Sequence, residues 1–189
     1  MFNERRNQIV WQNLFLVRHG ESTANEINRF AGTIDAPLTA LGEAQARRAG
    51  EDWGAGDIDR VYLSPLLRAR QTAEIIATAL GMAVETDQRL SDIRSGFDGR
   101  PVADYLAAIA ADPVDARVDG GESLRDYQHR VGGFLRWLRV QPFACVLIVA
   151  HEETLRILEA HCTGQNLSAL AGKAFANAVP YDFQSPSGN

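Results

Sequence analysis

The sequence has few of the features that mark secreted, membrane-spanning or disulfide-rich proteins. Its 189 residues include two cysteines, Cys145 and Cys162, and these do not form a CxxC pair. Isolated cysteines in apolar or helical surroundings favour buried free thiols in a reducing compartment over a disulfide or a catalytic thiol. No uncharged apolar run approaches the roughly 20 residues that span a bilayer, and residues 1–13 lack the apolar core of a signal peptide. We therefore expect a cytoplasmic protein that does not enter membranes.

An excess of positive charge is also missing. The chain has 19 Lys and Arg against 24 Asp and Glu, for a net charge of −5. Because nucleic acids and anionic membranes attract clustered positive charge, we expect neither as a partner. The chain contains no GxxxxGK[ST] loop, no HExxH motif and no Cys–His array. These absences argue against nucleotide-dependent transfer, and we expect no metal site and no cofactor.

Strand-like and helix-like segments alternate along the chain, which predicts a three-layer α/β/α sandwich with a mostly parallel central sheet. Residues 144–149 are the most continuous apolar run and predict a central strand that is buried on both faces. We expect one domain over residues 12–183 and flexible tails at 1–11 and 184–189. The predicted strands are 13–17, 60–63, 83–86, 144–149 and 178–183, and the predicted helices are 39–53, 66–80, 102–111, 123–139 and 153–162.

Polar side chains follow three of the predicted strands at the point where each strand ends. Arg18 and His19 follow the first strand, and His151 follows the apolar strand. Arg68 lies in the first turn of the helix that comes after the second strand. Because ligands bind outside the carboxyl ends of parallel strands, these four side chains are expected to meet at one edge of the sheet.

Two arginines and two histidines in one cluster suit the chemistry of phosphoryl transfer. Guanidinium groups match phosphate oxygens and stay charged at any working pH. Their field also favours the neutral form of a nearby imidazole, which can then attack phosphorus. The second histidine and the arginines would stabilise charge on the phosphoryl oxygens. The cluster therefore predicts a site for a small phosphorylated metabolite.

Short motifs then occur in a fixed order over almost the whole chain. They are LVRHGES at 16–22, NRFAG at 28–32, DAPLT at 35–39, SPLLRARQT at 64–72, GGES at 120–123 and VAH at 149–151. An RHG triplet alone is a weak signal, but the ordered set is specific. The chain resembles the histidine phosphatase superfamily in its phosphoglycerate-mutase-like branch.

The resemblance implies a role for each residue of the cluster. His19 would be the nucleophile that carries the phosphoryl group, and Arg18, Arg68 and His151 would hold that group. The residues expected to contact the substrate are Asn25, Ser22, Gly32 and Glu152.

The family also uses an acidic residue to protonate the leaving alkoxide, commonly the glutamate of an L-x-E segment. The matching segment here is Leu90-Ser91-Asp92, so Asp92 is the candidate general acid. A bound phosphate dianion beside it would favour the protonated form that a general acid needs. Asp92 is one methylene shorter than the usual glutamate, and an aspartate that caps a loop explains it nearly as well. Glu152 stands where the family generally has glycine, where it could repel a phosphate or contact a cationic group.

These observations predict a metal-independent phosphatase that hydrolyses a small phosphomonoester through a phosphohistidine on His19. A cofactor-dependent phosphoglycerate mutase is the second enzymatic interpretation. Such mutases usually carry a longer insertion before the final histidine, and the chain is short there, which favours hydrolysis. A third hypothesis is a pseudo-enzyme that binds a phosphorylated ligand without turnover. The sequence leaves the substrate and the oligomeric state open.

Overall fold

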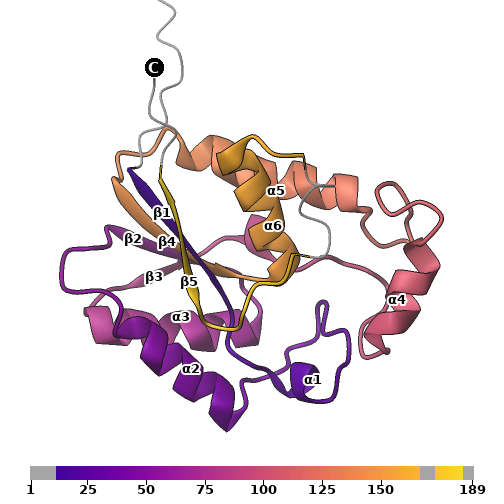
Figure 1. The fold of residues 1–189 in the computed structure, drawn as a ribbon, viewed down its shortest axis with the longest axis horizontal. Helices are drawn as coiled ribbons and strands as arrows, with labels where there is room; N and C mark the ends of the chain where they lie inside the picture. The colour runs from indigo at the N-terminus through magenta and orange to yellow at the C-terminus, as the bar shows by residue number, and fades with distance from the viewer. Residues whose placement is uncertain (1–11, 167–172, 185–189) are drawn as a thin grey trace, which may run out of the picture.

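The computed structural model describes residues 12–166 and 173–184, in which helices pack on both sides of one five-stranded sheet (Figure 1). The strand order is β3-β2-β4-β1-β5. All pairs among the first four strands are parallel, whereas β5 runs antiparallel to β1 at one edge. The predicted mostly parallel sheet is confirmed. The strands are β1 (Asn13–Arg18), β2 (Arg60–Leu63), β3 (Val84–Thr86), β4 (Cys145–Ala150) and β5 (Pro180–Gln184).

The five predicted helices are all present, with small shifts at their ends. The first of them ends at Gly50, three residues before the predicted end. The α-helices are α1 (Thr23–Glu26), α2 (Ala40–Gly50), α3 (Leu67–Leu80), α4 (Val102–Ile109), α5 (Leu124–Leu138) and α6 (Glu152–Thr163). A 3₁₀ turn at Gln88–Leu90 and α1 were not predicted, because each is too short to show a periodic pattern. None of the helices in the described ranges is long and apolar enough to cross a membrane.

Strand β4 separates two hydrophobic cores. Val146 and Ile148 pack with α5 and α6, while Leu147 and Val149 pack on the opposite face with α2 and α3. All four side chains are fully buried. This alternation is the two-residue period of a strand, and it explains why the run is apolar at every position. The prediction of a central strand buried on both faces is confirmed, and with it the three-layer α/β/α sandwich (Figure 1).

Two smaller predictions need correction. Gln184 is the last residue of β5 and pairs with Asn13, so it belongs to the sheet and not to a tail. The rest of the predicted tails, 1–11 and 185–189, lies outside the described residues. Both cysteines are free, but each is only partly buried, because Cys145 opens β4 and Cys162 lies in the last turn of α6.

Candidate active site

The ends of three neighbouring strands bring the predicted residues together. Arg18 pairs with Ala150 at the ends of β1 and β4, and Leu63 of β2 pairs with the adjacent residue of β4. Because these parallel strands stop level with one another, the residues that follow them meet at one edge of the sheet. His19 follows β1 and His151 follows β4, and their ring centroids are 5.3 Å apart. The predicted convergence is present.

A close approach of two backbone segments fixes the position of His19. The amide of Gly20 donates a hydrogen bond to the Thr72 hydroxyl at 3.0 Å. A Cβ at Gly20 would lie 2.4 Å from the carbonyl oxygen of Gly42 in the first turn of α2. The glycine of the RHG motif therefore allows α2 to pack against the loop that carries His19.

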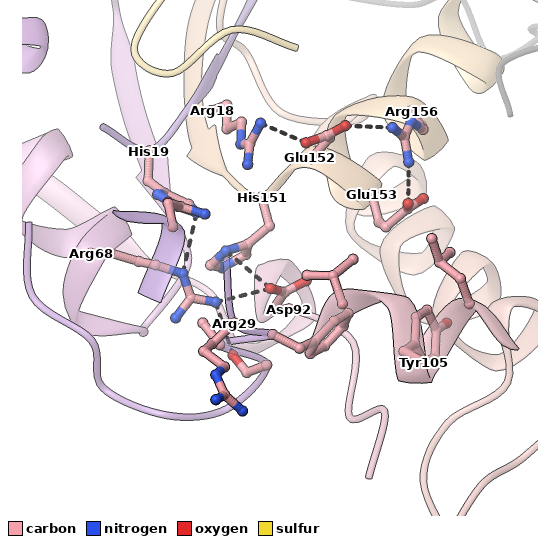
Figure 2. A pocket seen from close by; sticks show the side chains of 16 residues that line it. Arg18, His19, Arg29, Arg68, Asp92, Tyr105, His151, Glu152, Glu153 and Arg156 are labelled. Atoms are coloured by element: carbon pink, nitrogen blue, oxygen red, sulfur yellow. Dashed lines mark hydrogen bonds and ion pairs between the residues drawn. The ribbon is translucent and has the colours of Figure 1, made fainter. Parts of the chain in front are cut away.

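The imidazole of His19 is buried and turned so that one nitrogen faces the cavity. Its Nδ1 donates to the Gly20 carbonyl oxygen at 2.7 Å, which leaves a lone pair on Nε2. Arg68 Nε donates to this Nε2 at 3.2 Å (Figure 2). Burial lowers the pKa of His19 well below its ordinary value, and the nearby His151 and Arg68 lower it further. The ring is therefore neutral, as a nucleophile requires.

Arg68 is almost completely buried and is held by a loop from another part of the chain. Its two terminal nitrogens donate to the carbonyl oxygens of Gly32, at 2.9 Å, and Ile34, at 3.0 Å. Gly32 has a φ of +50°, and a Cβ there would lie 1.8 Å from Asp98 Oδ1. Gly32, predicted to contact the substrate, lines the cavity, and its carbonyl oxygen accepts a hydrogen bond that positions the Arg68 guanidinium.

Among the residues that the structure describes, two that line the cavity each have a buried nitrogen without a hydrogen bond: Arg18 Nε, and His151 Nδ1, which lies 3.5 Å from Asp92 Oδ2. The other ring nitrogen of His151 lies 2.7 Å from the Ser64 hydroxyl, and Arg18 Nη1 donates to the Phe175 carbonyl oxygen at 2.9 Å. If the Ser64 hydroxyl donates to His151 Nε2, then His151 Nδ1 carries a proton that points toward the cavity. Buried donors without partners are costly, so these two are suited to an anionic ligand.

Asp92 lies within contact distance of both Arg68 and His151. Its Oδ2 accepts a hydrogen bond from Arg68 Nη2 at 2.9 Å and lies 3.5 Å from His151 Nδ1. Its Oδ1 accepts from the amide of Ile93. The carboxylate is therefore within reach of a group bound at His19, and its loop-capping contact is a second role for the same side chain.

Arg130, on α5, fixes the loop that carries Asp92, and sequence reasoning missed it. It donates to the carbonyl oxygens of Arg89, Ser91 and Asp92. It also donates to both carboxylate oxygens of Glu122, at 2.8 and 2.7 Å. The bonds to the Asp92 loop join residues that are 38 to 41 positions apart in the sequence, so no local sequence pattern predicts them.

The first residues of α6 form the far wall of the cavity, where a single guanidinium joins two carboxylates (Figure 2). Glu152 Oε2 lies 2.5 Å from Arg18 Nη1, and its other oxygen binds Arg156. Arg156 also binds Glu153. Burial raises the pKa of Glu153 more than Arg156 lowers it, and the charges of Asp92 and Glu152 raise it further. Glu153 and Arg156 were not predicted, although their three-residue spacing on one helix was visible.

The remaining predicted residues divide into one that reaches the cavity and one that does not. Asn25 borders the cavity. Ser22 is fully buried outside it, where its hydroxyl caps α1 and donates to Asn25 Oδ1 at 2.9 Å. The prediction that Ser22 contacts the substrate therefore needs correction, because capping the helix uses its hydroxyl. The whole cavity has a volume of about 360 Å³, which is enough for a small metabolite.

Comparison with known proteins identifies the family of this chain. A phosphoserine phosphatase of Hydrogenobacter thermophilus is 32% identical over 82% of this chain and 78% of its own length. A probable phosphoglycerate mutase of Citrobacter koseri is 35% identical over 73% of this chain and 68% of its own length. The solved structure of a mycobacterial glucosyl-3-phosphoglycerate phosphatase with VO3 aligns with a TM-score of 0.79 and 26% identity, over 90% of each chain. The sequence pattern of the histidine phosphatase superfamily, branch 1, matches residues 14–181. The chain belongs to this superfamily.

Proposed function

We propose that the protein is a metal-independent phosphatase that hydrolyses a small-molecule phosphomonoester through a phosphohistidine on His19. The observation that carries the proposal is the state of His19, which is neutral, buried and bonded through Nδ1 to a backbone carbonyl. Its Nε2 carries no proton, accepts a hydrogen bond from Arg68 Nε at 3.2 Å, and belongs to a residue that lines the cavity. A nucleophile and a cation that can receive a phosphoryl oxygen thus stand side by side.

In the first step, His19 Nε2 attacks phosphorus, the N–P bond forms and the bond to the leaving oxygen breaks. Arg18 Nε and His151 Nδ1, which make no hydrogen bond within the described part of the chain, bind phosphoryl oxygens, and His151 Nδ1 then turns from Asp92 Oδ2, 3.5 Å away, to the phosphoryl group. Asp92 gives its proton to the leaving alkoxide, so the alcohol departs neutral. In the second step Asp92 takes a proton from water, the water oxygen bonds to phosphorus, and the N–P bond breaks to release phosphate.

Proton donation by Asp92 depends on a change at Arg68. In the free enzyme, Arg68 Nη2 binds the Asp92 carboxylate at 2.9 Å. When a phosphate dianion binds Arg68, Asp92 loses this counter-charge and faces additional negative charge, which favours its protonated form. The same event that places the substrate therefore prepares the acid.

Turnover of p-nitrophenyl phosphate by the wild type and by His19→Ala, with a chelator present, tests the proposal. We expect wild-type activity to survive the chelator and the variant to lose more than about 1,000-fold. Rapid quenching with labelled substrate should trap an acid-labile phosphoryl group that is missing in His19→Ala. Full activity of His19→Ala would refute the nucleophile.

Two assays distinguish a phosphatase from the two alternatives, a phosphoglycerate mutase and a pseudo-enzyme. The relatives include proteins named as phosphatases and as phosphoglycerate mutases. Transfer of phosphate between the positions of phosphoglycerate, faster than its release to water, would identify a mutase. Binding of phosphate and phosphomonoesters without turnover of any ester in a broad panel would identify a pseudo-enzyme.

A further inference from the structure

The cavity has two electrostatically different sides (Figure 2). Arg18 and Arg68 lie near His19, where the phosphoryl group binds. Three carboxylates border the space beyond it: Asp92, Glu152 and Glu153. A phosphomonoester that places phosphorus at His19 directs its leaving group into this space, which the phosphoryl-binding residues do not fill.

On this second side of the cavity, the guanidinium of Arg156 already binds two carboxylates. Arg156 uses all three of its nitrogens, because Nε donates to the Lys173 carbonyl oxygen and the terminal nitrogens bind Glu152 and Glu153. Arg29 also borders the cavity, but it lies at the exposed end and donates to the Gly99 carbonyl oxygen. The wall formed by the first turn of α6 therefore carries two carboxylates, Glu152 and Glu153, and the single guanidinium of Arg156.

Glu153 has a carboxylate oxygen that can still accept a hydrogen bond. One oxygen binds Arg156, and no residue in the described part of the chain donates to the other. The side chain is 35% exposed and borders the cavity. It also lies near the half-buried Tyr105, whose pKa is raised to about 12 by partial burial and, to a lesser extent, by the charge of Glu153. Glu152 differs, because its two oxygens bind Arg18 and Arg156.

We propose that Glu153 forms a subsite for a protonated amine on the leaving group. The preferred substrates are then phosphomonoesters of amino alcohols. This inference rests on the proposed phosphatase function, and it makes Glu153 a specificity residue. Neutral leaving groups gain nothing from this subsite, and carboxylate-bearing ones are repelled by it.

Acidic residues at the start of a helix also have an ordinary structural explanation. Glu152 and Glu153 occupy the first turn of α6, where negative charge interacts favourably with the helix dipole. That effect changes the melting temperature of a variant, but it does not change the order in which the enzyme prefers its substrates. The substrate preference therefore separates the two explanations.

The test compares kcat/KM for three esters of similar size: 2-aminoethyl phosphate, 2-hydroxyethyl phosphate and carboxymethyl phosphate. We expect the amine to exceed the neutral ester by about 10- to 100-fold, the range for a hydrogen bond to a charged group. The carboxylate should be the poorest substrate. In Glu153→Gln, the ratio of amine to neutral ester should fall to near one.

Glu152→Gln is the matched control, because it makes the same change of charge at the neighbouring residue of α6. Both oxygens of Glu152 are already bound, so we expect this variant to keep the amine preference. Equal kcat/KM of the wild type for the amine and the neutral ester would overturn the proposal. Equal loss of the preference in both variants would overturn the assignment to Glu153.

A binding measurement on the wild type separates failure of the subsite from failure of the proposed function. 2-Aminoethylphosphonate and propylphosphonate cannot be hydrolysed, and calorimetry measures their affinity without turnover. Tighter binding of the aminophosphonate supports the subsite even if no ester is hydrolysed. Equal binding refutes it whether or not the protein is a phosphatase.

Discussion

Replacing Glu152 by glutamine changes the competition for Arg18. In the free enzyme Glu152 Oε2 lies 2.5 Å from Arg18 Nη1, and the two side chains are 26% and 18% exposed. A phosphoryl group that binds this guanidinium must displace the carboxylate or tolerate its negative charge nearby. Glu152 therefore opposes the binding of inorganic phosphate, and its removal should tighten that binding.

The size of the effect follows from this contact. A partly buried hydrogen bond between charged groups contributes about 1.5–3 kcal/mol, whereas the neutral one that glutamine can form contributes about 1 kcal/mol. The competing interaction thus weakens by about 0.5–2 kcal/mol, which corresponds to about 2- to 30-fold in the dissociation constant of phosphate. Loss of the repulsion between the carboxylate and the phosphate dianion acts in the same direction. We expect phosphate to bind about tenfold tighter.

Calorimetric titration with inorganic phosphate at pH 7, and competitive inhibition by phosphate, measure this constant. The gain in Glu152→Gln should shrink as ionic strength rises, because salt screens partly exposed charges. Glu153→Gln is the control, since Glu153 does not contact Arg18, and its effect on phosphate should be smaller. Unchanged or weaker phosphate binding in Glu152→Gln would refute the competition.

Three further predictions follow from the site. Asp92→Asn should slow hydrolysis of alkyl phosphates by about 10²–10⁴-fold but p-nitrophenyl phosphate far less, because nitrophenolate needs no proton; equal losses would exclude an acid role. His151 has a pKa well below its ordinary value, chiefly through burial, so below pH 6.5 only the unfolded chain binds its proton. The free energy of unfolding should therefore fall with decreasing pH by about 1.4 kcal/mol per pH unit for this histidine. Chemical denaturation at several pH values should show that the free energy of unfolding depends less steeply on pH in His151→Gln. Gly32→Ala should destabilise the fold by about 1–3 kcal/mol and reduce kcat/KM, since its Cβ meets Asp98; Gly81→Ala, which has positive φ but open space around it, should spare activity.

The meeting of two arginines and two histidines at one edge of the sheet could be predicted because these residues occupy equivalent places in a repeated pattern. Arg18, His19 and His151 each stand at or just beyond the end of an apolar strand, and parallel strands must deliver such residues to the same edge. Arg68 follows from the same rule, since it lies in the first turn of the helix after β2. In each case a local pattern, combined with one rule of sheet architecture, gives the position of the residue in space.

The contacts that hold this cluster in place could not be predicted in the same way. Gly32 binds Arg68 through a backbone oxygen, and Asp98 restrains that loop across 65 residues of chain by accepting a hydrogen bond from the Thr33 amide. Arg130 supports the Asp92 loop from α5. These contacts depend on how loops close over the sheet, and a loop without periodicity does not encode its partner locally. Ser22 shows the converse, because its motif suggested substrate while its hydroxyl caps a helix.

The different contacts of Glu152 and Glu153 could not be predicted from the sequence. From the sequence, both are acidic residues in the first turn of a helix, three and four residues before Arg156, and this pattern alone predicts a stabilised helix terminus. In the structure α6 begins beside the end of β1, which brings Glu152 to Arg18, while one oxygen of Glu153, on the cavity wall, receives no hydrogen bond from any described residue. We therefore expect these two adjacent residues of the same type to have separable effects, one on the affinity for phosphate and the other on the preference for a positively charged leaving group. Because one substitution pair distinguishes these effects, the specificity of the site can be assigned to a single carboxylate by measurement.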